Sequence, residues 1–214
     1  GFPTTVSSHG ERDPETRRAV RPGPERSVRT VTGIHAARER SHMQIRTYGG
    51  VEDLRGAIEA HNRAWRVGFR GIVPSDVIDA ELRPTEDDAF DSLIEEIAAE
   101  PGAFLVAERD GAVVGFVRAR YGTTSEYVTG IGGEIVDLYV DPAHWRDGIG
   151  SSLLGSAVDN LPPMIDGIST RVLAENDRAR SFLEANDLVH EETVEATVGG
   201  RSFQHDVYRI GLDD

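Results

Sequence analysis

The chain has 214 residues, a formal net charge of −14 at pH 7, and 37 acidic residues against 23 lysine and arginine residues. All 23 of the latter are arginine and cysteine is absent, which excludes catalytic or phosphate-binding lysines, thiol nucleophiles, thiolate metal sites and disulfides. The length predicts one domain with a full core. An acidic, lysine-free composition is typical of proteins adapted to a salt-rich cytoplasm, although a genome biased toward arginine codons accounts for the missing lysine equally well.

Residues 1–42 differ in kind from the rest of the chain. They hold eight arginines and five acidic residues, whereas residues 43–214 hold 15 arginines and 32 acidic residues. Proline, serine, threonine and arginine dominate this segment and apolar periodicity is missing, so we expect a flexible N-terminal extension ahead of a domain over residues 43–214. A nucleic-acid-binding or partner-binding arm is one alternative. The acidic domain instead favours a tail, or an extension upstream of a start at Met43, with no nucleic-acid partner.

From Met43 onward the sequence alternates between strand-like and helix-like patterns. Period-two alternation marks strands, apolar residues at helical intervals mark helices, and glycine or proline pairs mark turns. In chain order these patterns predict a strand at 43–49, helices at 51–65, 75–82 and 86–99, a hairpin at 103–120 turning at Asp110-Gly111, a strand at 133–140, a helix at 150–161 that ends at Pro162-Pro163, a strand at 167–173, a helix at 176–186 with Asn176 as its N-cap, and a hairpin at 188–212 turning at Gly199-Gly200. This order predicts a mixed α/β domain without an internal repeat.

The stretch "DPAHWRDGIGSSLL", from Asp141 to Leu154, carries the strongest local signal. Gly148 and Gly150 follow a strand and open a helix, a context in which backbone N–H groups hold phosphates. A dinucleotide fingerprint would need Gly or Ala at position 153, which is Leu153, and a Walker loop would need a lysine. A different phosphate ligand, or a tight turn with no ligand, remains.

"DLYVDPAHWRDGIGSSLL" resembles the core signature of the GNAT superfamily of N-acetyltransferases, in which an apolar-Tyr-Val-x-Pro run is followed by Gln/Arg-x-x-Gly-x-Gly/Ala and a helix. The resemblance covers about residues 43–212, because the early helices, the first hairpin and the 176–186 helix fall where the family has them. It implies a GNAT fold, with a central mixed β-sheet flanked by helices. "WRVGFRGIVP", residues 65–74, is similar to an acceptor-side segment of many members.

The resemblance implies acetyl-CoA as cosubstrate. Unpaired N–H groups and the helix dipole would hold the pyrophosphate without lysine, and the end of the 133–140 strand would pair with the pantetheine as an added strand does. The expected cofactor-binding residues are Leu138, Tyr139, Val140, Arg146, Asp147, Gly148, Ile149, Gly150, Ser151, Asn176 and Phe182. No metal is expected, since the seven histidines show no ligand spacing.

Two residues depart from the family pattern. Trp145 stands at the Gln/Arg position, and Asp147 places a carboxylate beside a polyanion. We therefore expect acetyl-CoA affinity to rise where salt screens Asp147.

The resemblance also assigns catalytic roles. Glu134 is the expected general base, as in many members, with a solvated strand-end acid as the alternative reading; strand alternation predicts that Asp137 faces the opposite side. Leu183 stands where many members have a tyrosine acid. Tyr139 or Tyr208 would then donate the proton, or the thiolate would take it from water or the substrate; we expect Tyr139.

Trp65, Phe69 and Arg70 would line the acceptor cleft if the early helices overhang it as in the family. We expect acetyl transfer to a primary amine, on a small molecule or peptide, by direct attack in a ternary complex. A non-catalytic acyl-CoA-binding domain, suggested by Leu183, and a different acyl donor or acceptor stay open. Since no apolar run approaches the ~20 residues that span a bilayer, we expect a cytoplasmic protein without membrane contact; a homodimer stays open.

Overall fold

The computed structural model describes residues 42–212, apart from the side chains of residues 87–89. The predicted elements are confirmed within this range, and the predicted N-terminal extension lies outside it except for His42. The elements are β1 (Met43–Thr47), α1 (Val51–Gly68), α2 (Ser75–Glu81), α3 (Asp87–Ala99), β2 (Gly102–Arg109), β3 (Ala112–Tyr121), β4 (Gly132–Val140), η1 (Pro142–His144), α4 (Ile149–Asp159), β5 (Gly167–Leu173), α5 (Asp177–Glu184), β6 (Val189–Val198) and β7 (Arg201–Gly211). The short 3₁₀ helix η1 was not predicted.

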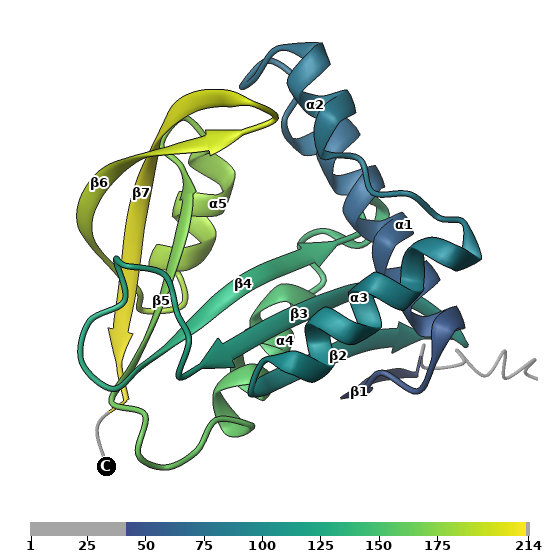
Figure 1. Cartoon of the computed structure of the whole chain (residues 1–214), viewed down its shortest axis with the longest axis horizontal. Helices are drawn as coiled ribbons and strands as arrows, with labels where there is room; N and C mark the ends of the chain where they lie inside the picture. The colour runs from purple at the N-terminus through teal and green to yellow at the C-terminus, as the bar shows by residue number, and fades with distance from the viewer. Residues whose placement is uncertain (1–41, 213–214) are drawn as a thin grey trace, which may run out of the picture. The chain divides into compact units, whose positions relative to one another are not determined.

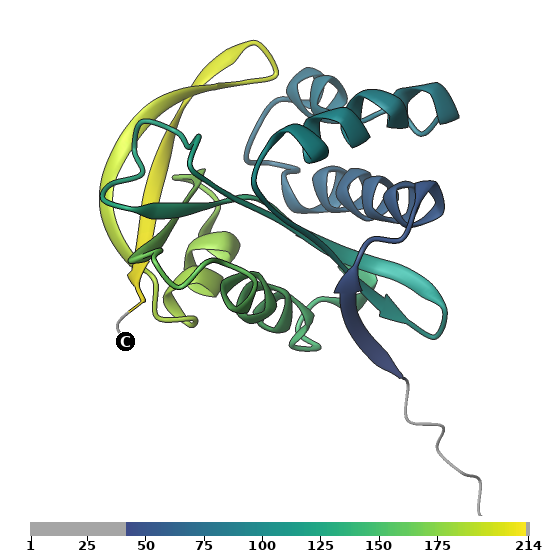
Figure 2. The same cartoon turned by 60° about the horizontal axis from the view of Figure 1, so that its bottom comes forward.

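Within residues 42–212, seven strands form one sheet in the order β1-β2-β3-β4-β5-β7-β6. The β4–β5 pair is parallel and the other neighbours are antiparallel, so the sheet is mixed, as predicted. Helices α1 and α3 cover one face, and α4 and α5 cover the other (Figure 2). We refer to these as the α1 face and the α4 face.

Local sequence explains the predicted turns. Asp110 and Gly111 both have positive φ, 53° and 82°, which is the backbone of the two-residue turn that fits a twisted hairpin. Gly199 and Gly200 repeat this at the β6–β7 turn, with φ of 53° and 75°. Asn176 caps α5 as predicted, because its side-chain oxygen accepts a hydrogen bond from the backbone N–H of Ala179 at 3.1 Å.

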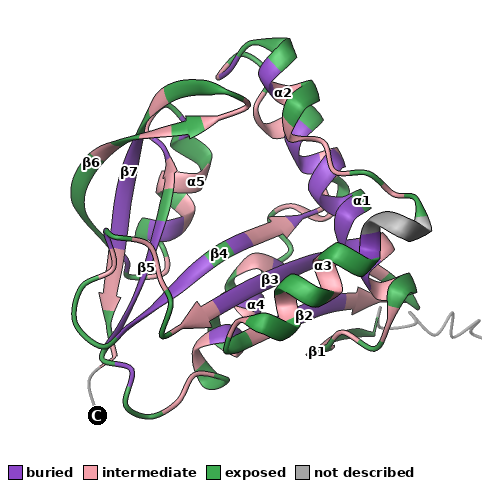
Figure 3. Cartoon of the chain, viewed as in Figure 1, coloured by how far each residue is buried: buried purple, intermediate pink, exposed green. Residues whose placement is uncertain are grey.

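The core lies on both faces of β3 and β4, whose central residues are buried (Figure 3). On the α4 face, the fully buried Leu153 of α4 packs in a cluster with Ile135 of β4. On the α1 face, Leu54 of α1 packs in a cluster with Phe116 of β3. Both helices are therefore docked by continuous apolar contact, which fixes β4 between them.

Strand β4 contains a bulge that the sequence analysis did not foresee. Asp137 pairs with Arg118 but Ile135 pairs with Ala119, so Val136 has no partner on β3. The extra residue shifts the alternation by one, and Glu134 and Asp137 both lie on the α1 face. The prediction that Asp137 faces away from Glu134 is wrong for this reason.

Beyond its first residues, β4 has no strand neighbour on the β5 side within residues 42–212. Pairing with β5 covers only Gly132–Glu134, after which β5 continues against β7 while β4 continues against β3 (Figure 1). The hydroxyl of Thr170 donates to the carbonyl of Ile135 at 3.0 Å where the strands separate. The rest of β4 is thus an open edge inside the sheet.

Main-chain groups alternate in direction along a strand, which identifies those that face this open edge. The N–H of Asp141 donates to Val114 on the β3 side at 2.8 Å. The N–H and C=O groups of Val140 and Leu138 therefore point to the β5 side, where they face no strand.

Truncation of the α4 docking residue tests this packing. Leu153→Ala should lower the free energy of unfolding by about 2–5 kcal/mol, because it leaves a cavity at a fully buried position. Chemical denaturation measures the change, and Val189→Ala, at a residue that is 67% exposed, is the control and should stay within about 0.5 kcal/mol. Equal effects of the two variants would contradict the assigned core.

Candidate active site

The turn between β4 and α4 exposes backbone N–H groups. Arg146 and Gly148 adopt left-handed backbone conformations with φ of 70° and 80°, and Gly148 is the N-cap of α4 without a side-chain cap. The first backbone bond of the helix runs from Ser152 to Gly148. The N–H groups of residues 149–151 therefore have no acceptor in the described part of the chain, and with the helix dipole they favour an anion.

Predicted cofactor residues meet beside this turn. A Cβ atom at Gly150 would lie 3.0 Å from the Phe182 ring and 3.8 Å from the Leu138 side chain. Glycine is thus needed here for close packing, and Leu138 and Phe182 form an apolar floor where the open edge of β4 reaches α4. Asn176, another predicted cofactor residue, is only 9% exposed. Its side-chain oxygen caps α5 by accepting a hydrogen bond from the helix backbone.

Asp147, expected to repel the phosphates, has a counterion in the structure. Asp147 forms an ion pair with Arg109 at the end of β2, and His144 lies 4.0 Å from the same carboxylate oxygen. Arg146 is exposed and has no ion-pair partner among the described residues. Since Asp147 already has a counterion, the expected rise of acetyl-CoA affinity with salt loses its physical basis.

Trp145, which departs from the family pattern, has a defined structural role. Its indole N–H donates to the carbonyl of Val140 at 2.7 Å, and the Arg178 guanidinium lies 4.0 Å from its ring centroid. A Cβ at Gly68 of α1 would lie 3.3 Å from the ring. Trp145 therefore connects β4 with α1 and α5. It also pairs with the carbonyl of Val140 on the open edge, whereas the N–H of Val140 stays available to a ligand.

Tyr139 lies on the α1 face among predicted acceptor-side residues. Trp65 donates its indole N–H to the Tyr139 hydroxyl at 3.2 Å, Trp65 stacks on Phe69 at 3.9 Å, and the His61 ring lies 4.6 Å from the Tyr139 ring. Burial, followed by the negative charge of Asp137, raises the pKa of Tyr139. The hydroxyl therefore keeps its proton across the neutral range.

The third predicted acceptor residue, Arg70, points elsewhere. It lines a surface pocket of about 380 Å³ together with Arg66, Val73 and Asp79, between the end of α1 and the start of α2. Val73 also belongs to the apolar cluster that contains Trp65. Val73 thus links the pocket to the cluster of Trp65, whereas Trp65 itself is not among the residues that line the pocket.

Tyr208, the other hydroxyl considered as an acid, lies on the opposite face. It is 1% exposed, belongs to the α4-face cluster with Leu183, and donates to Glu184 of α5 at 3.0 Å. Leu183 itself is buried in that cluster. Of the two candidate acids, only Tyr139 lies on the face that carries Trp65 and Phe69.

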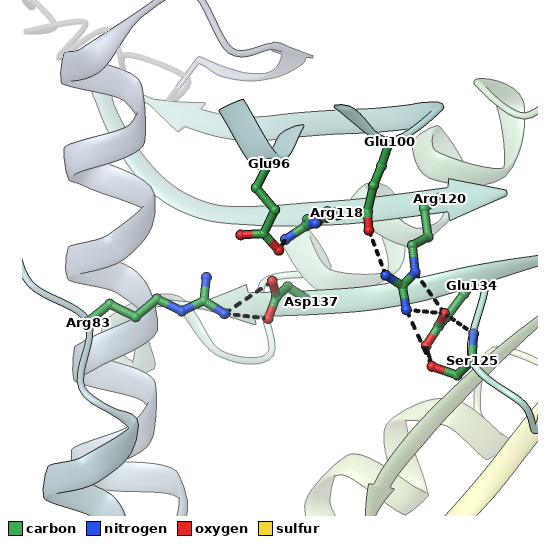
Figure 4. A network of polar contacts seen from close by, with 8 residues as sticks. All are labelled: Arg83, Glu96, Glu100, Arg118, Arg120, Ser125, Glu134 and Asp137. Carbon is green, nitrogen blue, oxygen red and sulfur yellow. Dashed lines mark hydrogen bonds and ion pairs between the residues drawn. The ribbon is translucent and has the colours of Figure 1, made fainter. Parts of the chain in front are cut away.

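Glu134, the predicted base, is surrounded by hydrogen-bond donors. It accepts from Arg120 Nε at 2.9 Å and from the backbone N–H and hydroxyl of Ser125 at 3.0 and 2.7 Å (Figure 4). It also accepts from the hydroxyl of Tyr127. Burial would raise the pKa of Glu134, but the hydrogen bonds from Tyr127, Ser125 and Arg120 outweigh it and the pKa is lowered. Glu134 thus holds the segment after β3 against β4. Because its oxygens are already engaged in these hydrogen bonds, the geometry weighs against a role as proton acceptor.

Asp137 lies further along the same face with fewer partners. Its side chain is 7% exposed, and one nitrogen of Arg83 contacts its two oxygens at 3.0 and 3.2 Å. Arg118, opposite Asp137 on β3, is paired instead with Glu96 and Glu100 of the α3 region (Figure 4). Sequence reasoning ranked Asp137 second because the bulge at Val136 leaves no sequence signal.

Neither metal binding nor membrane spanning finds support in the described residues. Among the side chains described within residues 42–212, no three His, Asp or Glu residues form a cluster able to hold a metal ion. None of the helices in that range combines the length and the apolar character needed to cross a bilayer.

Comparison with known proteins establishes the family. The model of the Acetyltransferase (GNAT) family matches residues 69–186, more than half of the chain. The chain therefore belongs to the GNAT family of acetyltransferases, as the β4–α4 signature predicts.

Individual relatives are distant. The chain is 25% identical over 111 residues to the uncharacterized N-acetyltransferase YuaI of Bacillus subtilis (strain 168), and this match covers 52% of the chain and 60% of YuaI, less than two thirds of that relative's length. Similar solved structures include the PaiA N-acetyltransferase from Thermoplasma acidophilum in complex with coenzyme A (21% identity, TM-score 0.61, covering 80% of this chain and 99% of that one). YncA from Salmonella typhimurium, with its cofactor acetyl-CoA, shares 20% identity at a TM-score of 0.58, covering 81% and 96% of the two chains. These likenesses show that the fold is the GNAT fold.

The Glu134 contacts predict a specific pH dependence of stability. Because the pKa of Glu134 is lowered on folding, the unfolded chain binds more protons below about pH 4.3, and the stabilisation is present above that pH and lost as pH falls through the folded-state pKa. Glu134→Gln should lower the free energy of unfolding by about 3 kcal/mol at pH 7, with a smaller difference below pH 4. Denaturant titrations across pH measure this.

A matched control is Glu59→Gln, which removes an exposed carboxylate paired with Arg63 on α1 and should change stability by less than about 1 kcal/mol. A wild-type-to-Glu134→Gln difference that is the same at pH 3.5 and pH 7 would contradict the assigned network.

Proposed function

We propose that the chain is an N-acetyltransferase that transfers acetyl from acetyl-CoA to a primary amine, by direct attack in a ternary complex. One observation carries the proposal: the open edge of β4 ends beside the uncapped N-terminus of α4. An extended chain of amides that ends in a pyrophosphate matches this pair of features, because the edge offers strand-like hydrogen bonds and the helix offers N–H donors to an anion.

The residues present fit acetyl-CoA. The main-chain groups of Leu138 and the N–H of Val140 would pair with the pantetheine amides, and residues 149–151 with Arg146 would hold the phosphates. The bound coenzymes named for PaiA and YncA support the same choice of donor. A chain without cysteine or lysine suits direct transfer, in which no protein nucleophile is acylated.

Tyr139 is the proposed proton donor to the departing sulfur. Its hydroxyl is protonated and accepts a hydrogen bond from Trp65, and Tyr139 lies on the α1 face between Leu138 and Val140 of the open edge. Tyr208, the other hydroxyl considered, and Leu183 both lie in the α4-face cluster, on the opposite side of the sheet from Trp65 and Phe69.

The acceptor would approach from the α1 face, near Trp65 and Phe69. Arg66 and Arg70 at the adjacent pocket favour acceptors that carry a carboxylate or phosphate in addition to the amine, because guanidinium groups bind such anions well. A cytoplasmic enzyme without a nucleic-acid or membrane partner is proposed, in line with the acidic composition.

A thiol-release screen tests the activity. The amines should span amino acids, polyamines, aminoglycosides and N-terminal peptides, each with acetyl-CoA and with longer acyl-CoA donors. Thiol release with at least one amine, coupled to formation of its acetamide, is the expected result. Tight acetyl-CoA binding without release for any amine would instead identify a non-catalytic acyl-CoA-binding domain, which Leu183 and the engaged Glu134 favour as the second candidate.

A glycine pair on α4 tests the donor site. Gly150→Val should weaken acetyl-CoA binding at least about tenfold, or about 1.4 kcal/mol, because a side chain there meets Phe182 and blocks approach to the first helical turn. Gly155→Val is the matched control on the same helix, where a Cβ meets nothing within 4 Å. Isothermal titration calorimetry gives both affinities, and equal affinities would contradict the placement.

A further inference from the structure

The α1 face of β4 carries three polar side chains in one row along the open-edge strand. The bulge at Val136 brings Glu134 and Asp137 to this face, and Tyr139 follows two residues later. Alternate residues of a strand lie about 7 Å apart, so the side chains of Asp137 and Tyr139 leave β4 at neighbouring positions on the same face. Both carboxylates of this row are buried, at 3% exposure for Glu134 and 7% for Asp137.

The two carboxylates differ in how many acceptor positions remain. An ionised carboxylate offers about four. Arg120, Ser125 and Tyr127 use those of Glu134. Asp137 has only one described partner, a single nitrogen of Arg83 that both oxygens share. Each charged donor stabilises a buried carboxylate. Asp137 can therefore bind a further cationic donor, whereas Glu134 has no acceptor position left for one.

Arg83 reaches Asp137 from the linker between α2 and α3, and its side chain is 32% exposed. It therefore covers Asp137 from the solvent side. The backbone of Arg83 is tied to Asn62 of α1 through two hydrogen bonds of 2.8 and 2.9 Å. The linker is thus held in place by contacts independent of the Arg83 guanidinium.

The other groups around Asp137 leave it as the available anion. Arg118 from β3 is paired with Glu96 and Glu100. His61 from α1 is buried, and that burial, together with the charge of Arg83, lowers its pKa to about 4, so it is neutral at pH 7. Tyr139 keeps its proton, as described above.

We infer that Asp137 is the residue that binds the acceptor ammonium and takes its proton, in place of Glu134. This inference rests on the proposed function. It assigns the acceptor as a cationic primary amine whose nitrogen docks between Asp137 and the open edge of β4.

The ammonium gives one proton to the Asp137 carboxylate, and the freed nitrogen lone pair attacks the thioester carbonyl carbon. The C–N bond forms and the C–S bond breaks, with its electron pair going to sulfur. Tyr139 gives its proton to that sulfur and receives the second proton of the nitrogen. The products are the acetamide and the coenzyme A thiol, and Asp137 releases its proton to solvent.

The test uses the full chain, acetyl-CoA and an amine found in the screen. Asp137→Asn should lower kcat/KM for the amine about 10²- to 10³-fold at pH 7, with a raised KM for the amine. The deficit should shrink as pH approaches the pKa of the amine, since the free base needs no proton acceptor. The acetyl-CoA dissociation constant should stay within about twofold, because a general base contributes to proton transfer rather than to donor binding.

Two further variants separate catalysis from structure. Glu96→Gln, on the same face but paired with Arg118, should match wild type. Asp137→Ala should recover activity with added formate, a small carboxylate that replaces the missing group, and this rescue would not occur if Asp137 had only a structural role.

Several results would overturn the inference. Wild-type rates and an unchanged pH profile in Asp137→Asn would do so while leaving the proposed function intact. Equal losses in Glu96→Gln and Asp137→Asn, or the pH-dependent loss appearing in Glu134→Gln instead, would also refute it. Binding of acetyl-CoA without acetylation of any amine would refute the proposed function and this inference together.

Discussion

The separation of β4 from its parallel neighbour β5 is the constraint on which the site depends. Only three residue pairs join the two strands, and among the described strands the remaining length of β4 pairs with β3 alone. The main chain of Leu138 and Val140 consequently faces an open edge within a buried sheet, where unpaired amides are costly unless a ligand or side chain pairs with them. Trp145 already pairs with the Val140 carbonyl. The α4 N-terminus begins at the same end, so the separation of β4 from β5 brings together the main-chain edge and the phosphate-binding turn of the proposed coenzyme A site.

The bulge at Val136 gives this edge its polar face. If β4 alternated regularly through Val136, Asp137 would share the α4 face with Ile135 and its apolar cluster, where a carboxylate is costly. With it, acidic and arginine side chains alternate across β3, β4 and the α3 region (Figure 4). Buried charges are tolerated when each has a partner. On this face of β4, Glu134 has the most hydrogen-bond donors around its carboxylate and Asp137 has the fewest. The same arrangement thus separates a structural carboxylate from a reactive one.

The fold was predictable because its signals are local. Asp110-Gly111, Gly199-Gly200 and the Asn176 cap each act within a few residues, and the β4–α4 signature fixes the family. Much of the site was not predictable, because it depends on pairs distant in sequence. Asp147 is neutralised by Arg109, 38 residues away, and Glu134 is bound by the segment that precedes β4. The bulge moved Asp137 to the other face, and a single inserted residue has no signature in composition or periodicity.

Hydrogen–deuterium exchange with and without acetyl-CoA tests the central claim, that the open edge of β4 and the first turn of α4 form one donor site. Acetyl-CoA should slow exchange of the Val140 and Leu138 amides and of the amides of residues 149–151, because all of these N–H groups lack acceptors in the described structure. Amides of β6, at the far edge of the sheet, should be unaffected. Saturating acetyl-CoA with no protection at β4 and α4, or with protection confined to other elements, would contradict the account.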